Sequence, residues 1–298
     1  MIGKISKRPL KIIGYVVVFL LFLVLFTYTG FPVESLKMRI ISEIKRNSPY
    51  DIEIGSMKFS DSLEMDFENV EIQRGNKVLK MDNIVVKPSL TDIISENMPV
   101  PFSANGLGGN ITGTVYLSRN NRMINNFKVR IKGVDTSYIE EFMNINSQDL
   151  DIKGKINGSV NVDIAKQGNR YTAQGSYSFD SDKIDISNIK IQSFTLPGYN
   201  NLETDLKGTF DSRKTKIARL SFKNKDFQLS FFGTMPPVWQ LSRGGKLDLF
   251  MNLNLYSNEA KMSFLKTFLS PQSDGTLAAK ILGTVSNPRL VKGDKYEF

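Results

Sequence analysis

Long runs in which apolar and polar residues alternate place the strongest constraint on the fold of this chain. From Ile152 to Ile164, every second residue over thirteen positions is apolar or glycine, and the residues between them are polar. The same alternation recurs in the segments 63–67, 127–131, 171–179, 202–210, 227–233, 247–255 and 277–285. A period of two indicates β-strands with one face buried and one face in water. Such strands favour an antiparallel sheet.

A glycine followed by a hydroxyl residue recurs inside these segments. GNITGTV, which begins at Gly109, returns as GKINGSV at Gly154, and LKGTF, FFGTM and ILGTV repeat its core. Counting by twos puts each central glycine on the apolar face of its strand and each hydroxyl on the polar face. These inner-face glycines are Gly113, Gly158, Gly208, Gly233 and Gly283. Since a glycine inside a strand marks a bend or a close approach, the row predicts a tightly curled sheet. A sandwich or barrel whose core needs small residues is the alternative.

Helices are expected to be few. Residues 34–47 carry Leu36, Ile40 and Ile44 at intervals of four, which predicts an amphipathic helix. Helical spacing or a capping pattern predicts further short helices at 89–97, 137–145 and 257–270. No linker rich in proline, glycine or serine divides the chain. We therefore expect one mainly β domain over residues 34–298, a long curved antiparallel sheet that is either an open groove or a sandwich.

The N-terminal segment predicts a membrane anchor. Residues 12–33 contain no charge, and these 22 residues would form a helix of about 33 Å, enough to cross a hydrocarbon core of about 30 Å. Representative residues are Ile12, Val17, Leu21 and Phe26. Four basic residues precede the run and no acidic residue appears before Glu34, so the N-terminus should stay in the cytoplasm. We expect residues 1–33 to form a basic tip and signal anchor. A cleaved signal peptide is the alternative, but the run is long and no A-x-A-like site follows it.

Charge gives no support for nucleic-acid binding. The net charge is +9, but without the four basic residues before the anchor 35 Lys and Arg stand against 30 Asp and Glu. A nucleic-acid binder usually concentrates its basic residues on one face. One strand face carries Lys128, Arg130 and Lys132, and another carries Glu64, Asp66 and Glu68. Both rows are interpreted as solvated faces, with a docking patch as the alternative.

The sequence contains no pattern that indicates catalysis. Cysteine and histidine are absent, which removes thiol nucleophiles, most zinc sites and the usual general base near neutral pH. GxSxG, HExxH and phosphate-binding glycine loops are also absent. Asp180, Asp182 and Asp185 could ligate calcium, but the segment lacks the glycine and final glutamate of a calcium loop, so a polar turn is preferred. We expect no enzyme activity, no cofactor and no metal site.

Two segments resemble bacterial envelope proteins. IEIGSMKFSDSLEMDFENVEIQRGNKVLKMDNIVVKPSLTDII, with its Asn69-Val70-x-Ile72 turn and the P-S-L step that begins at Pro88, is similar to the opening of AsmA-like proteins. The ending NEAKMSFLKTFLSPQSDGTLAAKILGTVSNPRL resembles the type II secretion system protein N family. A helix, a polar turn and a strand that closes in LGTVSNPRL carry that second likeness.

The resemblance implies a non-enzymatic inner-membrane accessory of type II protein secretion. Its β-rich domain would be periplasmic, with other inner-membrane components of the secretion apparatus as partners. AsmA-like relatives are taken to form a curved sheet with a groove that accommodates lipid. The alternative implied by the resemblance is therefore a lipid-binding or lipid-transfer protein that supports envelope assembly, with phospholipid as its ligand.

Overall fold

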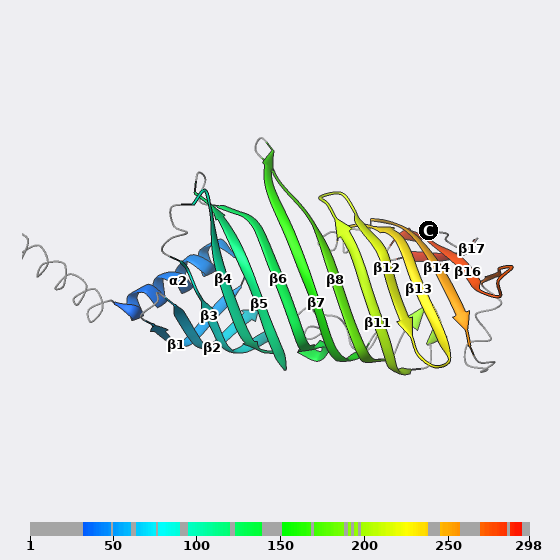
Figure 1. Cartoon of the computed structure of the whole chain (residues 1–298), viewed down its shortest axis with the longest axis horizontal. Coiled ribbons are helices and arrows are strands. Elements are labelled where there is room, and N and C mark those ends of the chain that lie inside the picture. The colour runs from blue at the N-terminus through cyan, green and yellow to red at the C-terminus, as the bar shows by residue number, and fades with distance from the viewer. Residues whose placement is uncertain are drawn as a thin grey trace, which may run out of the picture.

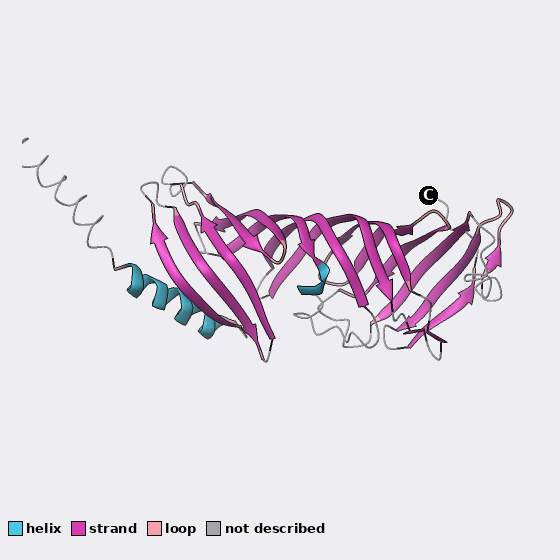
Figure 2. Ribbon diagram, turned by 90° about the horizontal axis from the view of Figure 1, so that it is seen from below, coloured by secondary structure: helices cyan, strands magenta, loops and turns pink. Residues whose placement is uncertain are grey.

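A large antiparallel sheet of fifteen strands dominates the structure (Figures 1 and 2). The computed structural model describes residues 32–48, 50–60, 64–75, 77–89, 95–119, 123–138, 151–167, 170–187, 190–191, 194–195, 198–237, 245–256, 269–284 and 287–293. The predicted mainly β fold with a long antiparallel sheet is confirmed. Ile12, Val17, Leu21 and Phe26 of the predicted anchor lie outside the described residues. Within the described residues, no helix has the length and apolar character needed to span a bilayer.

Most strands of the sheet pair with the next strand along the chain, so that the sheet is an up-and-down meander. The strands that pair in this order are β1 (Asp51–Phe59), β2 (Met65–Arg74), β3 (Lys77–Val86), β4 (Asn97–Gly106), β5 (Gly109–Ser118), β6 (Met123–Asp135), β7 (Asp151–Gln167), β8 (Arg170–Ser187), β11 (Tyr199–Phe210), β12 (Thr215–Lys223), β13 (Phe227–Met235), β14 (Lys246–Leu255) and β16 (Leu277–Thr284). β15 (Ser270–Pro271) and β17 (Asn287–Lys292) both pair with β16. β9 (Lys190–Ile191) and β10 (Phe194–Thr195) form a separate ladder.

Helix α2 (Val33–Asn47) packs on the first strands because one of its sides is apolar. Val33, Leu36 and Ile40 contact a buried cluster of Met57, Phe67, Val70, Met81, Ala104, Leu107 and Val134. Glu34 lies in the first turn and basic residues lie in the last, as the helix dipole favours. The amphipathic helix predicted for residues 34–47 is confirmed.

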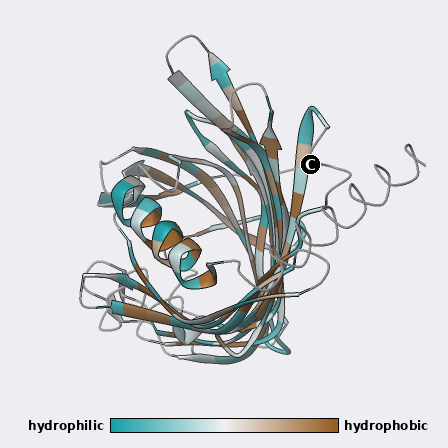
Figure 3. Cartoon of the chain, turned by 90° about the vertical axis from the view of Figure 1, so that its left-hand side faces the viewer, coloured by the Kyte–Doolittle hydropathy of each residue, from teal (hydrophilic) through white to brown (hydrophobic). Residues whose placement is uncertain are grey.

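The sheet is strongly curved, and α2 lies on the inside of the curve (Figure 3). The pairing register shifts between β3 and β4 and then in every successive pair from β5–β6 to β12–β13. Such bulges bend strands and increase their twist. At the register shift in the pairing of β6 with β7, Gly133 has a φ of 67°, and its N–H donates to the Asn157 side chain at 3.0 Å. Bulges therefore contribute to the curvature.

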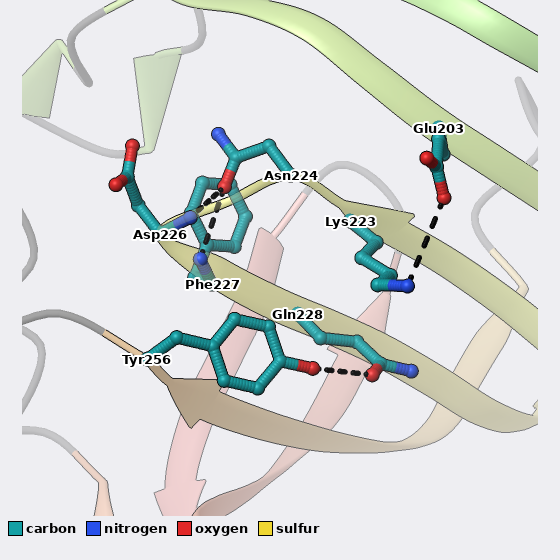
Figure 4. A network of polar contacts seen from close by, with 7 residues as sticks. All are labelled: Glu203, Lys223, Asn224, Asp226, Phe227, Gln228 and Tyr256. Carbon is teal, nitrogen blue, oxygen red and sulfur yellow. Dashed lines mark hydrogen bonds and ion pairs between the residues drawn. The ribbon is translucent and has the colours of Figure 1, made fainter.

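A second buried cluster lies at the C-terminal end of the sheet. Its members are Ile184, Ile186, Leu202, Phe227, Met251, Leu253, Leu269, Leu277 and Ala279. The β12–β13 turn positions Phe227, because the Asn224 side-chain oxygen accepts the Phe227 N–H at 3.0 Å (Figure 4). Nearby, the Tyr256 hydroxyl donates to the Gln228 oxygen at 2.9 Å. The Phe227 ring then meets the Tyr199 ring edge-on at 5.2 Å.

Two predicted helices are wrong at their C-terminal ends. Asn97 begins β4 and pairs with Ser118, and Ser270 belongs to β15 and pairs with Ala278. In both places the ladder partner supplies backbone hydrogen bonds that local helical spacing cannot reveal. Residues 90–94 and 257–268 of these two segments lie outside the described residues. Of the helix predicted at 137–145, the described residues Ser137 and Tyr138 are helical.

The predicted polar turn at Asp180, Asp182 and Asp185 is also wrong, because all three residues lie within β8. The register between β7 and β8 shifts in this region, which lets all three carboxylates stay exposed within a strand. Asp180 accepts a hydrogen bond from the Asn157 amide at 3.2 Å, and Asp185 accepts one from the Asn201 N–H at 2.8 Å.

Candidate functional site

One face of the sheet is apolar across its whole width. Side chains of residues paired on neighbouring strands point to the same side of the sheet, so the pairing register shows which residues of successive strands share this face. Val100 lies opposite Val115, Val115 opposite Phe127, and Phe127 opposite Val162. Across β8 the same face continues to Phe210. Because α2 packs on this face and lies inside the curve, the apolar face is the concave one (Figure 3).

Buried clusters cover the two ends of the concave face and leave a partly exposed stretch between them. The N-terminal end lies under α2, and at the C-terminal end Leu269, which is 1% exposed, packs into the second cluster. The residues between the clusters are Val115, Phe127, Val129, Val160, Tyr177, Phe179, Leu206 and Phe210, and each is partly exposed. We call this set the middle face.

Aromatic rings of neighbouring strands cover four glycines of the concave face, Gly113, Gly158, Gly175 and Gly208. Phe102 is paired with Gly113, and a methyl group added to Gly113 would come within 2.7 Å of the Phe102 ring. Phe179 is paired with Gly158, where an added methyl group would collide with the Phe179 ring. The missing side chain thus leaves room for a ring to lie across the neighbouring backbone. This aromatic cover stabilises glycine-containing strands that would otherwise be weak.

At the centre of the middle face, two such pairs are reciprocal between β8 and β11. Tyr177 is paired with Gly208, and Phe210 is paired with Gly175. The Tyr177 and Phe210 rings stack with their centroids 6.5 Å apart. The Tyr177 hydroxyl donates to the Lys216 carbonyl oxygen at 3.3 Å. Burial raises the pKa of Tyr177 above its ordinary value, so this hydroxyl is neutral at physiological pH.

The structure places all five predicted inner-face glycines on the concave side of the sheet. Gly113, Gly158 and Gly208 are the ring-covered positions described above. The other two, Gly233 and Gly283, lie opposite Leu249 and Leu247 of β14. Their φ angles of 130° and 100° favour glycine for a different reason, backbone conformation.

Sequence reasoning missed the rings that cover Gly113, Gly158, Gly175 and Gly208. The available signal was the alternation of apolar and polar residues. It places four rings on the apolar face of their strands, those of Phe102, Tyr177, Phe179 and Phe210. The alternation shows on which face of the sheet a side chain lies, but it does not show which glycine a ring covers. The pairing depends on the register between strands.

The convex face carries a shallow polar hollow of about 370 Å³, whose lining includes Asp163, Ser176, Asp211 and Lys216. Asp163 accepts a hydrogen bond from the Asn126 amide. Backbone N–H groups of the turn after Asp211 hold the pKa of its carboxyl below the ordinary range. Both carboxylates thus have structural hydrogen bonds. In the described part of the chain, no group of three or more acidic side chains could hold a metal ion.

Comparison with known proteins identifies no relative. No family model, no curated protein and no solved structure matches this chain. The resemblance to the type II secretion system protein N family therefore stays a prediction, and the geometry of the concave face carries the functional argument.

Proposed function

We propose that this protein holds the acyl chains of membrane phospholipids along the concave face of its sheet. The observation that carries the proposal is the middle face, an apolar and partly exposed stretch between two covered ends. Contiguous exposed apolar surface on a folded protein marks an interaction site. The ligand is bound non-covalently, and the proposed role in envelope assembly is that of an AsmA-like lipid-binding or lipid-transfer protein without enzyme activity.

The chemistry of the middle face suits a hydrocarbon chain. Its side chains are aliphatic or aromatic, and its central hydroxyl, that of Tyr177, is neutral and directed to a backbone carbonyl. Each methylene group transferred from water to such a surface contributes roughly 0.8 kcal/mol. A long acyl chain lying across several strands would therefore bind through many small contacts. Rings lying over Gly158 and Gly208 supply a broad apolar surface for these contacts.

The position of α2 supports delivery of lipid from a membrane. α2 begins at Val33, the last residue of the predicted anchor, and packs at one end of the concave face (Figure 1). β17 lies at the opposite end of the long axis (Figure 1). An anchored chain would thus hold the α2 end of the concave face near the bilayer. We propose a single-pass location in the bacterial inner membrane with the sheet in the periplasm.

The first prediction concerns bound lipid. Val160→Asp should strongly reduce the phospholipid that co-purifies with the full chain, because a carboxylate on the middle face opposes contact with hydrocarbon. Val160→Thr keeps the shape of the side chain and a good strand propensity, and should give a smaller reduction. Lipid per mole of protein, measured by mass spectrometry, tests both changes.

Ser159→Asp is the matched control, since Ser159 is the adjacent, exposed residue on the convex side of β7. It carries the same anchor and the same added charge, so lipid bound by the anchor cancels in the comparison. Melting curves establish that each variant is folded. Equal lipid content in the folded Val160→Asp and Ser159→Asp variants would contradict the proposed function.

The second prediction concerns topology. A reporter enzyme fused after Phe298 should be active only when it is exported, because the basic residues before the apolar run hold the N-terminus in the cytoplasm. The mature protein should also keep Met1. Protein sequencing of the mature chain checks this, and an N-terminus near Gly30 or Glu34 would show that the segment is a cleaved signal peptide.

The role as an accessory of type II secretion is a separate proposal. It rests on the resemblance of residues 258–290, and its expected partners are inner-membrane components of the secretion apparatus. The lipid-binding role rests instead on the concave face of the sheet. The two roles therefore depend on different parts of the chain.

A further inference from the structure

A row of three basic side chains lies on the convex face of the sheet, opposite to the apolar face. Lys128, Arg130 and Lys132 occupy alternate positions of β6, and all three are exposed. At about 3.4 Å per residue, neighbouring members of the row stand about 6.8 Å apart, and the row is about 14 Å long. This spacing repeats that of alternate side chains in any extended peptide.

The strands on both sides of this row contribute uncharged polar groups. The paired residues are Asn110, Thr112 and Thr114 on β5, and Ser159 and Asn161 on β7. Among the described residues, no carboxylate forms an ion pair with Lys128, Arg130 or Lys132; Lys128 lies over the Tyr116 ring at 5.6 Å. The row thus has cations at its centre and hydroxyl or amide donors along its sides.

The acidic row of Glu64, Asp66 and Glu68 differs, because lysines form ion pairs with two of its three carboxylates. Glu68 is bonded to Lys58 and to the Ser56 hydroxyl, and these bonds hold the pKa of the Glu68 carboxyl below its ordinary value. Glu64 lies 3.1 Å from Lys87. The interpretation as a solvated face therefore suits the acidic row. The basic row has no such ion pair among the described residues.

We infer that the β6 row docks an extended acidic segment of a partner protein, with carboxylates at every second residue. Such a segment lying along β6 would place one carboxylate at each cation. The flanking Thr112 and Ser159 hydroxyls would donate to the remaining carboxylate oxygens. The row lies along a single strand on the convex side of the sheet. An extended peptide can follow the whole row.

This docking surface is independent of the proposed lipid function, because it lies on the other face of the sheet. The test uses the full chain in nanodiscs of zwitterionic lipid and a labelled peptide in which glutamate alternates with threonine. Fluorescence anisotropy measures its Kd. Neutralising the row by K128Q, R130Q and K132Q together should weaken binding roughly tenfold, since three exposed ion pairs of ordinary strength add up to about that factor.

The matched control removes the same charge elsewhere, by K216Q, K225Q and K292Q, three residues that are also exposed. It should leave the Kd within about twofold, because salt screens the effect of distant exposed charges on the bound peptide.

A peptide of the same composition with consecutive glutamates should bind more weakly than the alternating one. Equal loss in both triple variants, equal binding of both peptides, or no binding of the alternating peptide would overturn the inference. Loss of binding to the unaltered chain in anionic nanodiscs would assign the row to the membrane surface instead and would also overturn it.

Discussion

Gly208→Leu is expected to lower the melting temperature of the protein by several degrees, whereas Thr209→Lys should change it little. A side chain added at Gly208 would come within 2.6 Å of the Tyr177 ring and would also meet the Lys216 carbonyl oxygen. Tyr177 would then have to leave its place over the glycine and its stack with Phe210. Overpacking of this kind typically costs about 1–3 kcal/mol, and each kcal/mol shifts the melting temperature by a few degrees at this size.

Thr209 provides the control because it is the next residue on the same strand and its side chain is exposed on the convex face. Gly158→Leu and Ser159→Lys form a second matched pair, in which Phe179 takes the place of Tyr177. Thermal melts followed by circular dichroism measure all four variants. If the two lysine variants melt lower than the two leucine variants, the assignment of the concave and convex faces is inverted.

Leu253→Ala should give the largest loss of stability, about 2–5 kcal/mol. Leu253 has no exposed surface and lies between Leu229 of β13 and Leu277 of β16 in the C-terminal cluster. Truncation would remove apolar contacts and leave a cavity, because the strands on both sides fix the backbone. The denaturation midpoint in urea should fall while the m-value stays constant, since the surface exposed on unfolding is nearly unchanged.

Leu290→Ala supplies the comparison for this measurement. Leu290 lies on β17 and is 40% exposed, so its truncation should change stability by at most about 0.5 kcal/mol. Two similar midpoints would show that the C-terminal cluster does not contribute the core stability assigned to it. A changed m-value for Leu253→Ala would indicate that the native or unfolded state itself had altered.

Much of the fold could be predicted because the relevant pattern is local. The alternation from Ile152 to Ile164 and from Leu247 to Leu255 lies in the strands β7 and β14. Leu36, Ile40 and Ile44 at intervals of four gave the helix that the structure shows as α2. In each case hydrophobic periodicity within one segment identifies both the element and the side of it that is buried. The same parity placed Gly158 and Gly208 on the apolar face.

Other features depend on pairing between segments, which the sequence of one segment does not specify. The alternation of apolar and polar residues predicts that Tyr177 and Gly208 share a face. Only the register between β8 and β11 places the ring over the glycine. The segment around Asp182 has the composition of a turn, yet the pairing of β7 with β8, which includes a bulge, keeps this residue within a strand. A shift of one residue in pairing would reverse the face of a whole strand. The register is fixed by the packing of many strands together.

The charged rows show the same division. The sequence alone determined that Lys128, Arg130 and Lys132 share one face of a strand, and that Glu64, Asp66 and Glu68 share another. Only the tertiary structure decided that Lys58 pairs with Glu68 and Lys87 with Glu64, and that Thr112 and Ser159 flank the basic row. Ion pairs depend on distances of a few ångströms between residues from different strands. Those distances exist only after the sheet has formed.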